Sequence, residues 1–463
     1  MYKDTIAAIS TAVSQSGIGI IRISGEEAFS VIDKIYCSPG GKKKLSRKPS
    51  HTVHYGYIRD GEELIDEVLV TIMRAPRTFT AEDTVEINCH GGVYAMKRVL
   101  ETVLKNGARP AMPGEFTKRA FLNGRIDLSR AEAVIDVIQA KNEYALKSSL
   151  GQLRGSLQKA IEEVRREILH EIARIEAALD DPEHMSLEGY GEALLEKKRK
   201  WMEKLQKLID SSENGRLIRE GVKTAIVGKP NAGKSSLLNF LLGEERAIVT
   251  EVEGTTRDIL TETVQMGDIT LNVADTAGIR DTQDQVEKIG VERARKNALE
   301  ADLIIYVTDS SRKLDENDRA IMEMLQGKKV IILLNKTDLE PVTSEKELEA
   351  CKKEWLPQAP VLPVSAKKEE GMELLEKTVR EMFYQGKISF NDEVYITNAR
   401  HKNLLTEARE SLEQVENSIQ SGMPEDFFSI DLMSACEALG EITGAQAGED
   451  LVNEIFSKFC MGK

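Results

Sequence analysis

The sequence contains no long apolar run and few cysteines. No run approaches the ~18 consecutive apolar residues of a membrane-spanning helix, so we expect no membrane span. The five cysteines, at positions 37, 89, 351, 436 and 460, are odd in number and form no close pair. This usage favours a reduced, cytoplasmic compartment over a disulfide scaffold. The first residues lack a basic region followed by an apolar core, so we also expect no secretion signal.

The chain also has no excess of positive charge. Its net charge of −14 argues against a protein that coats nucleic acid. The charge is uneven, because residues 1–118 carry 16 Lys and Arg against 14 Asp and Glu, a net charge of +2. Local nucleic-acid binding therefore stays open. The length of 463 residues predicts about three domains.

A glycine-rich stretch, Gly228–Ser236, lies between two apolar runs and reads G-x-x-x-x-G-K-S. The order of strand, glycine-rich turn and helix is that of a phosphate-binding loop, whose backbone N–H groups cradle phosphate. Lys234 then reaches the outer phosphates, and the Ser235 hydroxyl can bind magnesium. The alternative, a chance glycine-rich turn, is disfavoured by this context.

Three later segments extend this interpretation. Each follows an apolar run: Asp275–Gly278 follows Ile269–Ala274, Asn335–Asp338 follows Val330–Leu334, and Ser365–Lys367 follows Pro360–Val364. Their order and spacing resemble the guanine-nucleotide signature of translational GTPases. That resemblance implies that Asp338 pairs with the ring N–H and amino group of guanine. Ile279 stands where Ras-like enzymes have a water-orienting glutamine, so either hydrolysis is slow or another group orients the water.

The rest of the chain predicts a mixed α/β region and two helical regions. We expect strands near residues 5–9, 19–23, 53–58, 67–73 and 84–89, and a helix over 93–106. Cys89 and His90 are a weak metal candidate, because adjacent strand residues point apart. Apolar residues at helical spacing predict a long helix over about 153–175, ended by Pro182, and a charged helix over about 191–210.

Helical patterns resume over 404–419, 430–439 and 450–459, on the far side of the nucleotide motifs. We therefore expect one helical bundle interrupted by a doubly wound P-loop GTPase domain. The expected domains are an N-terminal α/β domain at 1–118, a first helical half at 119–215, the GTPase domain at 216–382 and a second helical half at 383–463.

Several segments together resemble the bacterial tRNA-modification GTPases of the MnmE (TrmE) family. They are GKPNAGKSS, GTTRD (254–258), DTAGIR (275–280), NKTD, SAK, PGEFTKRAFLNGRIDLSRAEAVIDVI (113–138) and the terminal FCMGK (459–463). The resemblance covers essentially the whole chain. It implies a homodimeric, potassium-dependent GTPase that works with a FAD-containing partner of the MnmG (GidA) family in a hetero-oligomer. Together they modify carbon five of the wobble uridine of certain tRNAs, adding an aminomethyl or carboxymethylaminomethyl group.

The resemblance also implies the residues of the nucleotide site. It implies that Asn231, Thr250, Val252 and Thr255 bind potassium and that Ser235 and Thr256 bind magnesium. Glu287 resembles the family's water-orienting carboxylate, although by itself it reads as an ordinary solvated helix residue. Catalysis is thus expected from Glu287, Asn231 and Lys234. The expected GTP-binding residues are Asn231, Ala232, Gly233, Lys234, Ser235, Ser236, Thr250, Glu251, Val252, Glu253, Gly254, Thr255, Thr256, Asp275, Thr276, Ala277, Gly278, Asn335, Lys336, Asp338, Ser365, Ala366 and Lys367.

A folate pocket in the N-terminal domain, which also dimerises the protein, is implied in the same way. The one-carbon unit would come from 5-formyltetrahydrofolate or a related folate, bound by Arg22, Glu82, Arg125 and Lys463. Two guanidiniums suit a ligand rich in carboxylates, although both arginines also fit structural ion pairs. The tail is expected to reach this pocket across the dimer, with Cys460 as a candidate nucleophile or a positioning element.

Two other functions share part of these features. A GTPase assembly factor for ribosomes or RNA has the same nucleotide motifs but no use for a folate pocket or a terminal Cys-x-Gly-Lys. A plain folate-binding or one-carbon-transfer protein has no use for the GTPase domain.

Overall fold

The computed structural model describes residues 4–41, 44–243, 261–274, 300–384, 394–445, 448–460 and 462. The chain folds into two compact units. One comprises residues 1–139, 149–205 and 403–463, and the other comprises residues 140–148 and 206–402. Within the described residues, no helix is long and apolar enough to cross a membrane.

The N-terminal part of the first unit is a seven-stranded sheet in the order β3-β4-β5-β6-β2-β1-β7. All neighbouring strands are antiparallel except β1 and β7, which are parallel. The strands are β1 (Ile6–Ile9), β2 (Ile18–Ser24), β3 (Tyr36–Cys37), β4 (Thr52–Asp60), β5 (Glu63–Met73), β6 (Thr84–His90) and β7 (Arg109–Pro110). The five strands expected here are therefore present, within a few residues of their predicted bounds.

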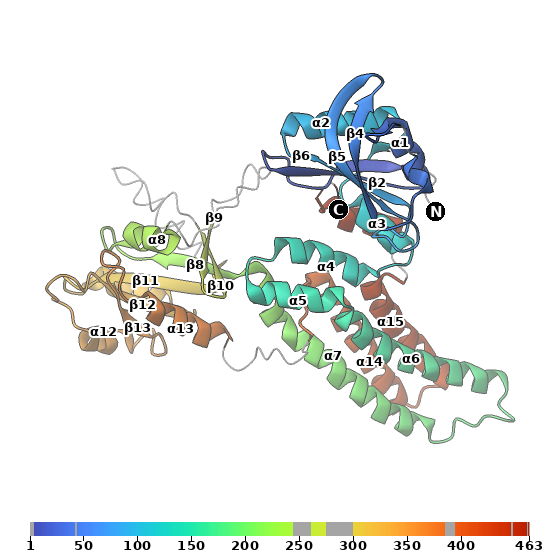
Figure 1. The fold of residues 1–463 in the computed structure, drawn as a ribbon. Helices are drawn as coiled ribbons and strands as arrows, with labels where there is room; N and C mark the ends of the chain where they lie inside the picture. The colour runs from blue at the N-terminus through green and yellow to red at the C-terminus, as the bar shows by residue number, and fades with distance from the viewer. Residues whose placement is uncertain are drawn as a thin grey trace. The chain divides into compact units, whose positions relative to one another are not determined.

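The two faces of this sheet are covered differently. Helices α1 (Ala28–Ile35) and α2 (Val93–Lys105) share a hydrophobic core with one face and lie above the sheet in Figure 1. On the other face, Phe116 of α3 (Glu115–Leu122) packs against Ile6 and Ala8 of β1. Tyr55 and Leu69 of the β4–β5 hairpin are exposed.

The helical part of the first unit joins distant segments of the chain. Helices α4 (Leu128–Gln139), α6 (Ser156–Asp180), α15 (Glu425–Thr443) and α16 (Glu449–Ser457) lie within the first unit, and α5 (Glu143–Leu153), α7 (Tyr190–Glu220) and α14 (Ala399–Gln420) each have residues in both units. The short helix η1 (Leu45–Arg47) belongs to the sheet region. Helix α6 packs along α15. An ion pair between Lys198 and Glu416 links α7 to α14. The helices before and after the nucleotide motifs thus pack together.

Helix α7 is ten residues longer than its sequence pattern predicts, and the prediction that it ends near Asp210 is wrong. Ser211 and Ser212, which are weak helix formers, follow Asp210. Leu217 and Ile218 are nevertheless buried in a hydrophobic core, and this packing outweighs the weak helix propensity of serine. The helix therefore runs through the expected domain boundary at residues 215–216.

The second unit contains a six-stranded sheet in the order β13-β12-β11-β8-β10-β9, parallel except for β9. Its strands are β8 (Val222–Val227), β9 (Thr261–Met266), β10 (Ile269–Ala274), β11 (Leu303–Asp309), β12 (Val330–Asn335) and β13 (Val361–Pro363). Helices α8 (Lys234–Leu242) and α13 (Met372–Tyr384) share one core with the sheet. A second core joins the sheet to α11 (Glu316–Met324) and α12 (Glu345–Lys352). Helices on both faces of a mostly parallel sheet make this a doubly wound fold.

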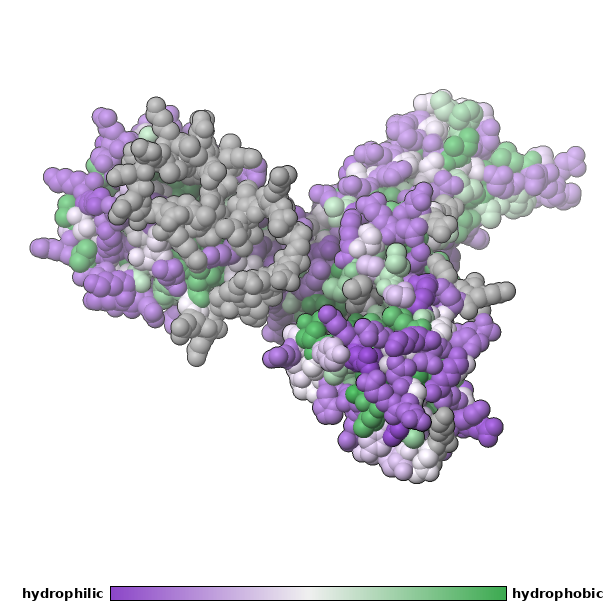
Figure 2. Space-filling view, turned by 90° about the horizontal axis from the view of Figure 1, so that it is seen from above, coloured by the Kyte–Doolittle hydropathy of each residue, from purple (hydrophilic) through white to green (hydrophobic). Residues whose placement is uncertain are grey.

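The surface agrees with a composition that is 30% charged. On the face drawn in Figure 2, hydrophilic residues cover most of the described surface and hydrophobic residues form smaller, separate patches.

Candidate functional site: a nucleotide cradle and a tail pocket

The loop after β8 has the backbone conformation that phosphate binding requires. Gly228, Asn231 and Gly233 have φ angles of 158°, 62° and 97°, and asparagine is one of the few side chains that tolerates this region. An ideal Cβ on Gly228 would lie 2.3 Å from the carbonyl oxygen of Val307 in β11. Only glycine therefore allows the loop to leave β8 so close to its neighbouring strand.

Lys234 begins α8 and folds back over this loop. Its Nζ donates hydrogen bonds to the carbonyl oxygens of Gly228, at 2.7 Å, and Lys229, at 2.8 Å. Burial lowers the pKa of Lys234. The ammonium lies at the N-terminus of a helix, where backbone N–H groups also attract anions.

The guanine-side segments lie at the same edge of the sheet. Asn335, at the end of β12, donates through Nδ2 to the carbonyl oxygen of Ala232 at 2.9 Å and accepts from the Ala366 N–H at 3.2 Å. One buried side chain thus joins the phosphate-binding loop to the segment after β13. Ser365 Oγ donates to Asp338 Oδ1 at 2.8 Å, and this bond lowers the pKa of Asp338. Asp338 stays an acceptor, as pairing with guanine's two donors requires.

Lys336 also lies at this edge and pairs with Asp309 of β11 at 2.7 Å. At the ends of β8, β12 and β13 of one sheet, the structure therefore brings together Asn231, Ala232, Gly233, Lys234, Ser235, Ser236, Asn335, Lys336, Asp338, Ser365, Ala366 and Lys367. The other expected nucleotide-site residues, namely Thr250–Thr256, Asp275–Gly278, Ile279 and Glu287, lie outside the described residues, as does Lys463.

The second candidate site lies where the C-terminus meets the sheet of the first unit. The backbone N–H of Gly114 donates to the carbonyl oxygen of Cys460 at 3.3 Å. Gly114 has a φ of 67°, and an ideal Cβ there would lie 2.5 Å from the carbonyl oxygen of Phe456 and 2.8 Å from Cβ of Phe459. The segments PGEF and FCMGK, the most distinctive parts of the sequence, are therefore in direct contact.

Two hydrogen bonds hold the end of the tail on β1 and β2. The carbonyl oxygen of Gly462 accepts from Ser10 Oγ at 3.1 Å and from Arg22 Nη1 at 3.2 Å. Gly462 has a φ of 88°, and an ideal Cβ would lie 2.4 Å from the carbonyl oxygen of Ile9. Gly462 lies against its own chain in this structure of a single chain. The expectation that the tail crosses to a partner subunit stays a prediction. The thiol of Cys460 is exposed.

Arg22 and Arg125 lie beside the same aromatic ring. Their guanidinium carbons are 5.8 and 5.2 Å from the ring centroid of Phe79. Arg22 also pairs with Glu86 at 2.8 Å, whereas the described residues offer no carboxylate within ion-pair distance of Arg125. Burial, followed by the neighbouring charge of Arg130, lowers the pKa of Arg125. An exposed guanidinium without an ion-pair partner beside an aromatic face suits a flat ligand that carries carboxylates.

Glu82 is held by a buried charge network that the sequence did not reveal. Its carboxylate accepts from Ser24 Oγ at 2.8 Å and pairs with Arg119 at 3.2 Å. Arg119 is 0% exposed and also pairs with Asp4 and with Glu115, which in turn pair with Arg109. The only sequence signal was the i, i+4 spacing of Glu115 and Arg119 within the segment 113–138.

The weak metal candidate on β6 has ordinary partners. Cys89 is buried and donates to the carbonyl oxygen of Gly19, while His90 pairs with Asp66 at 2.7 Å. Burial raises the pKa of Cys89 to about 11. Over the described ranges, no three His, Cys, Asp or Glu side chains form a group able to hold a metal ion.

Comparisons with known proteins settle the family. The profile described as the N-terminus of the GTP-binding protein TrmE matches residues 5–125, and that described as the MnmE helical domain matches residues 128–460. The chain belongs to the MnmE family. It is 58% identical over 463 residues to a tRNA modification GTPase MnmE from Lachnoclostridium phytofermentans, covering all of both chains. It is 49% identical over 465 residues to one from Thermoanaerobacter pseudethanolicus, again covering all of both.

Solved structures give local matches to this MnmE-family chain. A crystal structure of Era from Aquifex aeolicus is 26% identical, with a TM-score of 0.28, and the match covers 41% of this chain and 66% of Era. The G domain of the T. maritima FeoB iron transporter is 29% identical, with a TM-score of 0.27, over 35% of this chain and 99% of that domain. The family assignment rests on the sequence matches.

Proposed function

We propose that this MnmE-family chain hydrolyses GTP to GDP and phosphate and couples hydrolysis to the modification of tRNA. The observation that carries the nucleotide half is Asn335, which joins the phosphate-binding loop to the guanine-side loops. Its bonds keep Lys234 and Asp338 on one rigid frame. The tRNA half is supported by relatives that carry the name tRNA modification GTPase over their full length.

Within the cradle, we assign each described residue a task in hydrolysis. Lys234 donates to phosphate oxygens, and the Ser235 hydroxyl is the group that would bind magnesium. The amide of Asn231, held at positive φ at the loop's surface, is the described group that would bind potassium together with Thr250, Val252 and Thr255. Bound there, the ion's positive charge would offset the negative charge that develops on the phosphates in the transition state. Glu287 would orient the attacking water in place of the glutamine that Ile279 replaces.

In the first unit, we assign the tail pocket to folate-dependent chemistry on the wobble uridine. Arg125 and Arg22 would bind the carboxylates of a folate, with Glu82 and Lys463 beside them. The folate would supply the one-carbon unit. The contact of Gly462 with Arg22 supports a tail that completes this pocket. We further propose that the protein is a cytoplasmic homodimer and works with a FAD-containing partner.

A complementation experiment tests the overall assignment. A strain that lacks its own copy of this gene is given the parent gene, a Lys234→Ala variant or an empty plasmid. Nucleosides of its tRNA are then analysed by mass spectrometry. We expect the parent gene alone to restore the modified wobble uridine. Unchanged nucleosides in all strains, with altered ribosomal-subunit profiles in the deletion strain, would instead establish a ribosome assembly factor.

Replacing potassium by sodium tests the ion. We expect hydrolysis by the purified protein to fall about 10²–10³-fold in sodium, the loss typical of one removed transition-state stabiliser. Equal rates in the two salts would contradict the potassium site. An Asn231→Ala variant that is slow in both salts but still binds GTP would place the ion at Asn231.

A further inference from the structure

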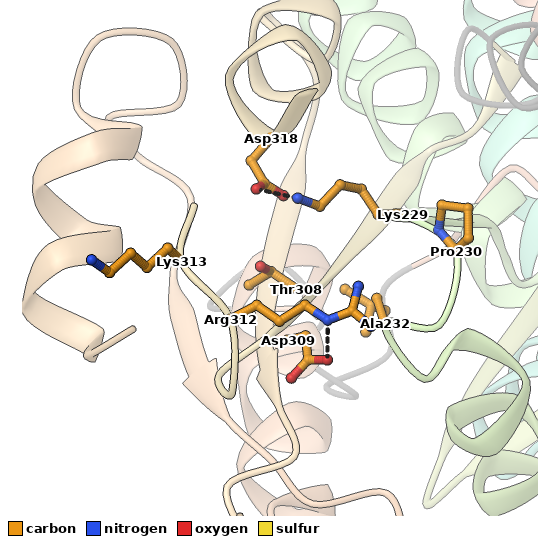
Figure 3. A pocket seen from close by; sticks show the side chains of 9 residues that line it. Lys229, Pro230, Ala232, Thr308, Asp309, Arg312, Lys313 and Asp318 are labelled. Atoms are coloured by element: carbon orange, nitrogen blue, oxygen red, sulfur yellow. Dashed lines mark hydrogen bonds and ion pairs between the residues drawn. The ribbon is translucent and has the colours of Figure 1, made fainter. Parts of the chain in front are cut away.

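The second residue of the phosphate-binding loop is tied to a helix far away in the sequence. Lys229 Nζ lies 2.8 Å from Asp315 and 2.6 Å from Asp318, at the start of α11. Figure 3 shows the side chain of Lys229 extending from the loop, where Pro230 and Ala232 follow, to the carboxylate of Asp318. The same loop that would hold the phosphates is thus anchored by a side chain to the segment after β11.

The anchor at α11 is itself rigid. Asp318 is buried, and its Oδ1 accepts a hydrogen bond from the hydroxyl of Tyr306 at 2.7 Å. Tyr306 lies in β11 and is itself fully buried. Asp318 Oδ2 accepts from the backbone N–H of Asp315 at 3.0 Å. Asp315 caps α11 by accepting from the N–H groups of Asn317 and Asp318, so the two aspartates form a capping box. The Asp318 carboxylate, which accepts from both the Tyr306 hydroxyl and the Asp315 N–H, gives Lys229 a fixed partner and not a mobile surface charge.

The backbone of Lys229 faces the catalytic lysine. Its carbonyl oxygen accepts from Lys234 Nζ at 2.8 Å and from the Ala232 N–H at 3.3 Å. One residue therefore bonds α11 with its side chain and Lys234 with its backbone. Any movement of Lys229 shifts one of the two carbonyl oxygens that orient the Lys234 ammonium in this structure.

The small pocket beside this anchor is not a second ligand site. It is lined by Lys229, Pro230, Ala232, Val307, Thr308, Asp309, Arg312, Lys313 and Asp318 (Figure 3). Its volume of about 10 Å³ is room for a single water molecule. Its charged side chains pair with one another, Arg312 with Asp309 at 3.5 Å and Lys229 with Asp318. The geometry is that of a support for the loop.

We propose that Lys229 is a positioning residue for GTP hydrolysis, which fixes the phosphate-binding loop to α11 and so places the ammonium of Lys234. This inference rests on the GTP hydrolysis proposed above. It assigns Lys229 no contact with the nucleotide. Misplacing a catalytic group by about 1 Å can cost about 100-fold in rate, so a flexible Lys229 should slow turnover more than it weakens GDP binding.

A double-mutant cycle in the full-length protein tests this role. The steady-state kcat and KM for GTP are measured for the parent, Lys229→Met, Asp318→Asn and the double variant. We expect each single substitution to lower kcat about 10-fold, and the double variant to be no slower than the slower single one, because both remove the same anchor. Lys229→Arg, which keeps the charge, should recover most of the loss. Lys313→Met removes another lysine beside the pocket and should leave kcat unchanged.

Each alternative outcome has a definite meaning. The proposed role of Lys229 would be overturned if the kcat losses of the two single variants multiplied in the double variant. It would also be overturned if Lys229→Met changed mainly KM. A Lys229→Met variant with the parent's kcat would overturn it as well. A parent protein that hydrolyses no GTP would instead contradict the proposed function. Thermal unfolding of each variant shows whether the protein is still folded at the assay temperature, so that a lower kcat can be assigned to the site.

Discussion

The nucleotide cradle and the tail pocket are held together in different ways. In the cradle, the backbone conformations of Gly228 and Gly233 and the side chain of Asn335 position short loops at the ends of parallel strands. In the tail pocket, the buried ion pairs of Arg119 join segments within the N-terminal region, and the contact of Gly462 with Arg22 joins opposite ends of the chain. A local motif therefore specifies the first site, whereas the second exists only once the N- and C-terminal segments have met.

The largest expected effect follows from the buried charges of the tail pocket. Arg119→Met removes the guanidinium that pairs with Asp4, Glu82 and Glu115. Asp4 and Glu115 keep Arg109 as a partner, whereas the buried Glu82 loses the ion pair with Arg119. Leaving one buried carboxylate uncompensated typically costs about 3–5 kcal/mol. We expect hydrogen exchange to accelerate strongly in peptides covering β2 and β6, and not in β11 or β12 of the other unit. Arg125→Met removes an exposed arginine without these ion pairs and should leave the protection unchanged. Equal protection in both variants would show that the network contributes little.

A comparable experiment addresses the backbone of the cradle. Gly233 has a φ of 97°, and an ideal Cβ would lie 2.2 Å from Asn335 Nδ2. Gly233→Ala should therefore break the bond from Asn335 to the loop and lower GTPase activity about 100-fold or more. Gly243→Ala lies just after the same helix, where the one described atom within 4 Å of an ideal Cβ is the carbonyl oxygen of Phe240, at 3.5 Å. This variant should stay close to the parent. Retained hydrolysis in Gly233→Ala would mean that the loop does not depend on this conformation.

The tail offers a matched pair of glycines. Gly462→Ala should collide with the carbonyl oxygen of Ile9 and release the tail from Arg22, whereas Gly448→Ala has open space around it. We expect tRNA modification to fall about 10-fold or more in Gly462→Ala alone, with GTP hydrolysis unchanged in both. The comparison fails if both variants modify tRNA equally well.

The smallest effect is a pH dependence. Ser365 Oγ lowers the pKa of Asp338, and guanine pairing needs the ionised carboxylate, so binding weakens as pH falls through that pKa. Ser365→Ala should return the pKa toward its ordinary value and move this loss to higher pH. We expect GDP affinity to be similar to the parent at about pH 7.5 and about twofold weaker near pH 4, where a carboxyl of ordinary pKa is about half protonated. A constant ratio across this range would show that the serine acts only through packing.

The elements and the nucleotide motifs were predictable because local patterns encode them. Apolar runs located β1, β2, β4, β5 and β6 of the first sheet and β8, β10, β12 and β13 of the second, but not β3, β7, β9 or β11. The motif spacing placed Lys234 at the start of a helix and Asp338 just after a strand, as the structure confirms. Parallel strands then carry those loops to one edge without further information.

The tail pocket was less predictable because its partners are separated by most of the chain. Arg22 and Gly462 lie 440 positions apart, and no local pattern indicates such a contact. The ring of Phe79, which lies beside both Arg22 and Arg125, and the buried pairs of Arg119 likewise carry no periodicity. The length of helix α7 was also not predictable from local sequence, because the helix continues past Asp210 to bury Leu217 and Ile218 in the core.

Deleting Cys460–Lys463 tests most directly the claim that the two sites are built separately and serve one reaction. GTP hydrolysis in potassium and wobble-uridine modification are measured on the same preparation of the shortened protein, with its partner protein and unmodified tRNA. We predict that hydrolysis is retained, because the cradle lies wholly within the other unit, and that modification is lost. Retained modification, or loss of both activities in a folded protein, would contradict this account.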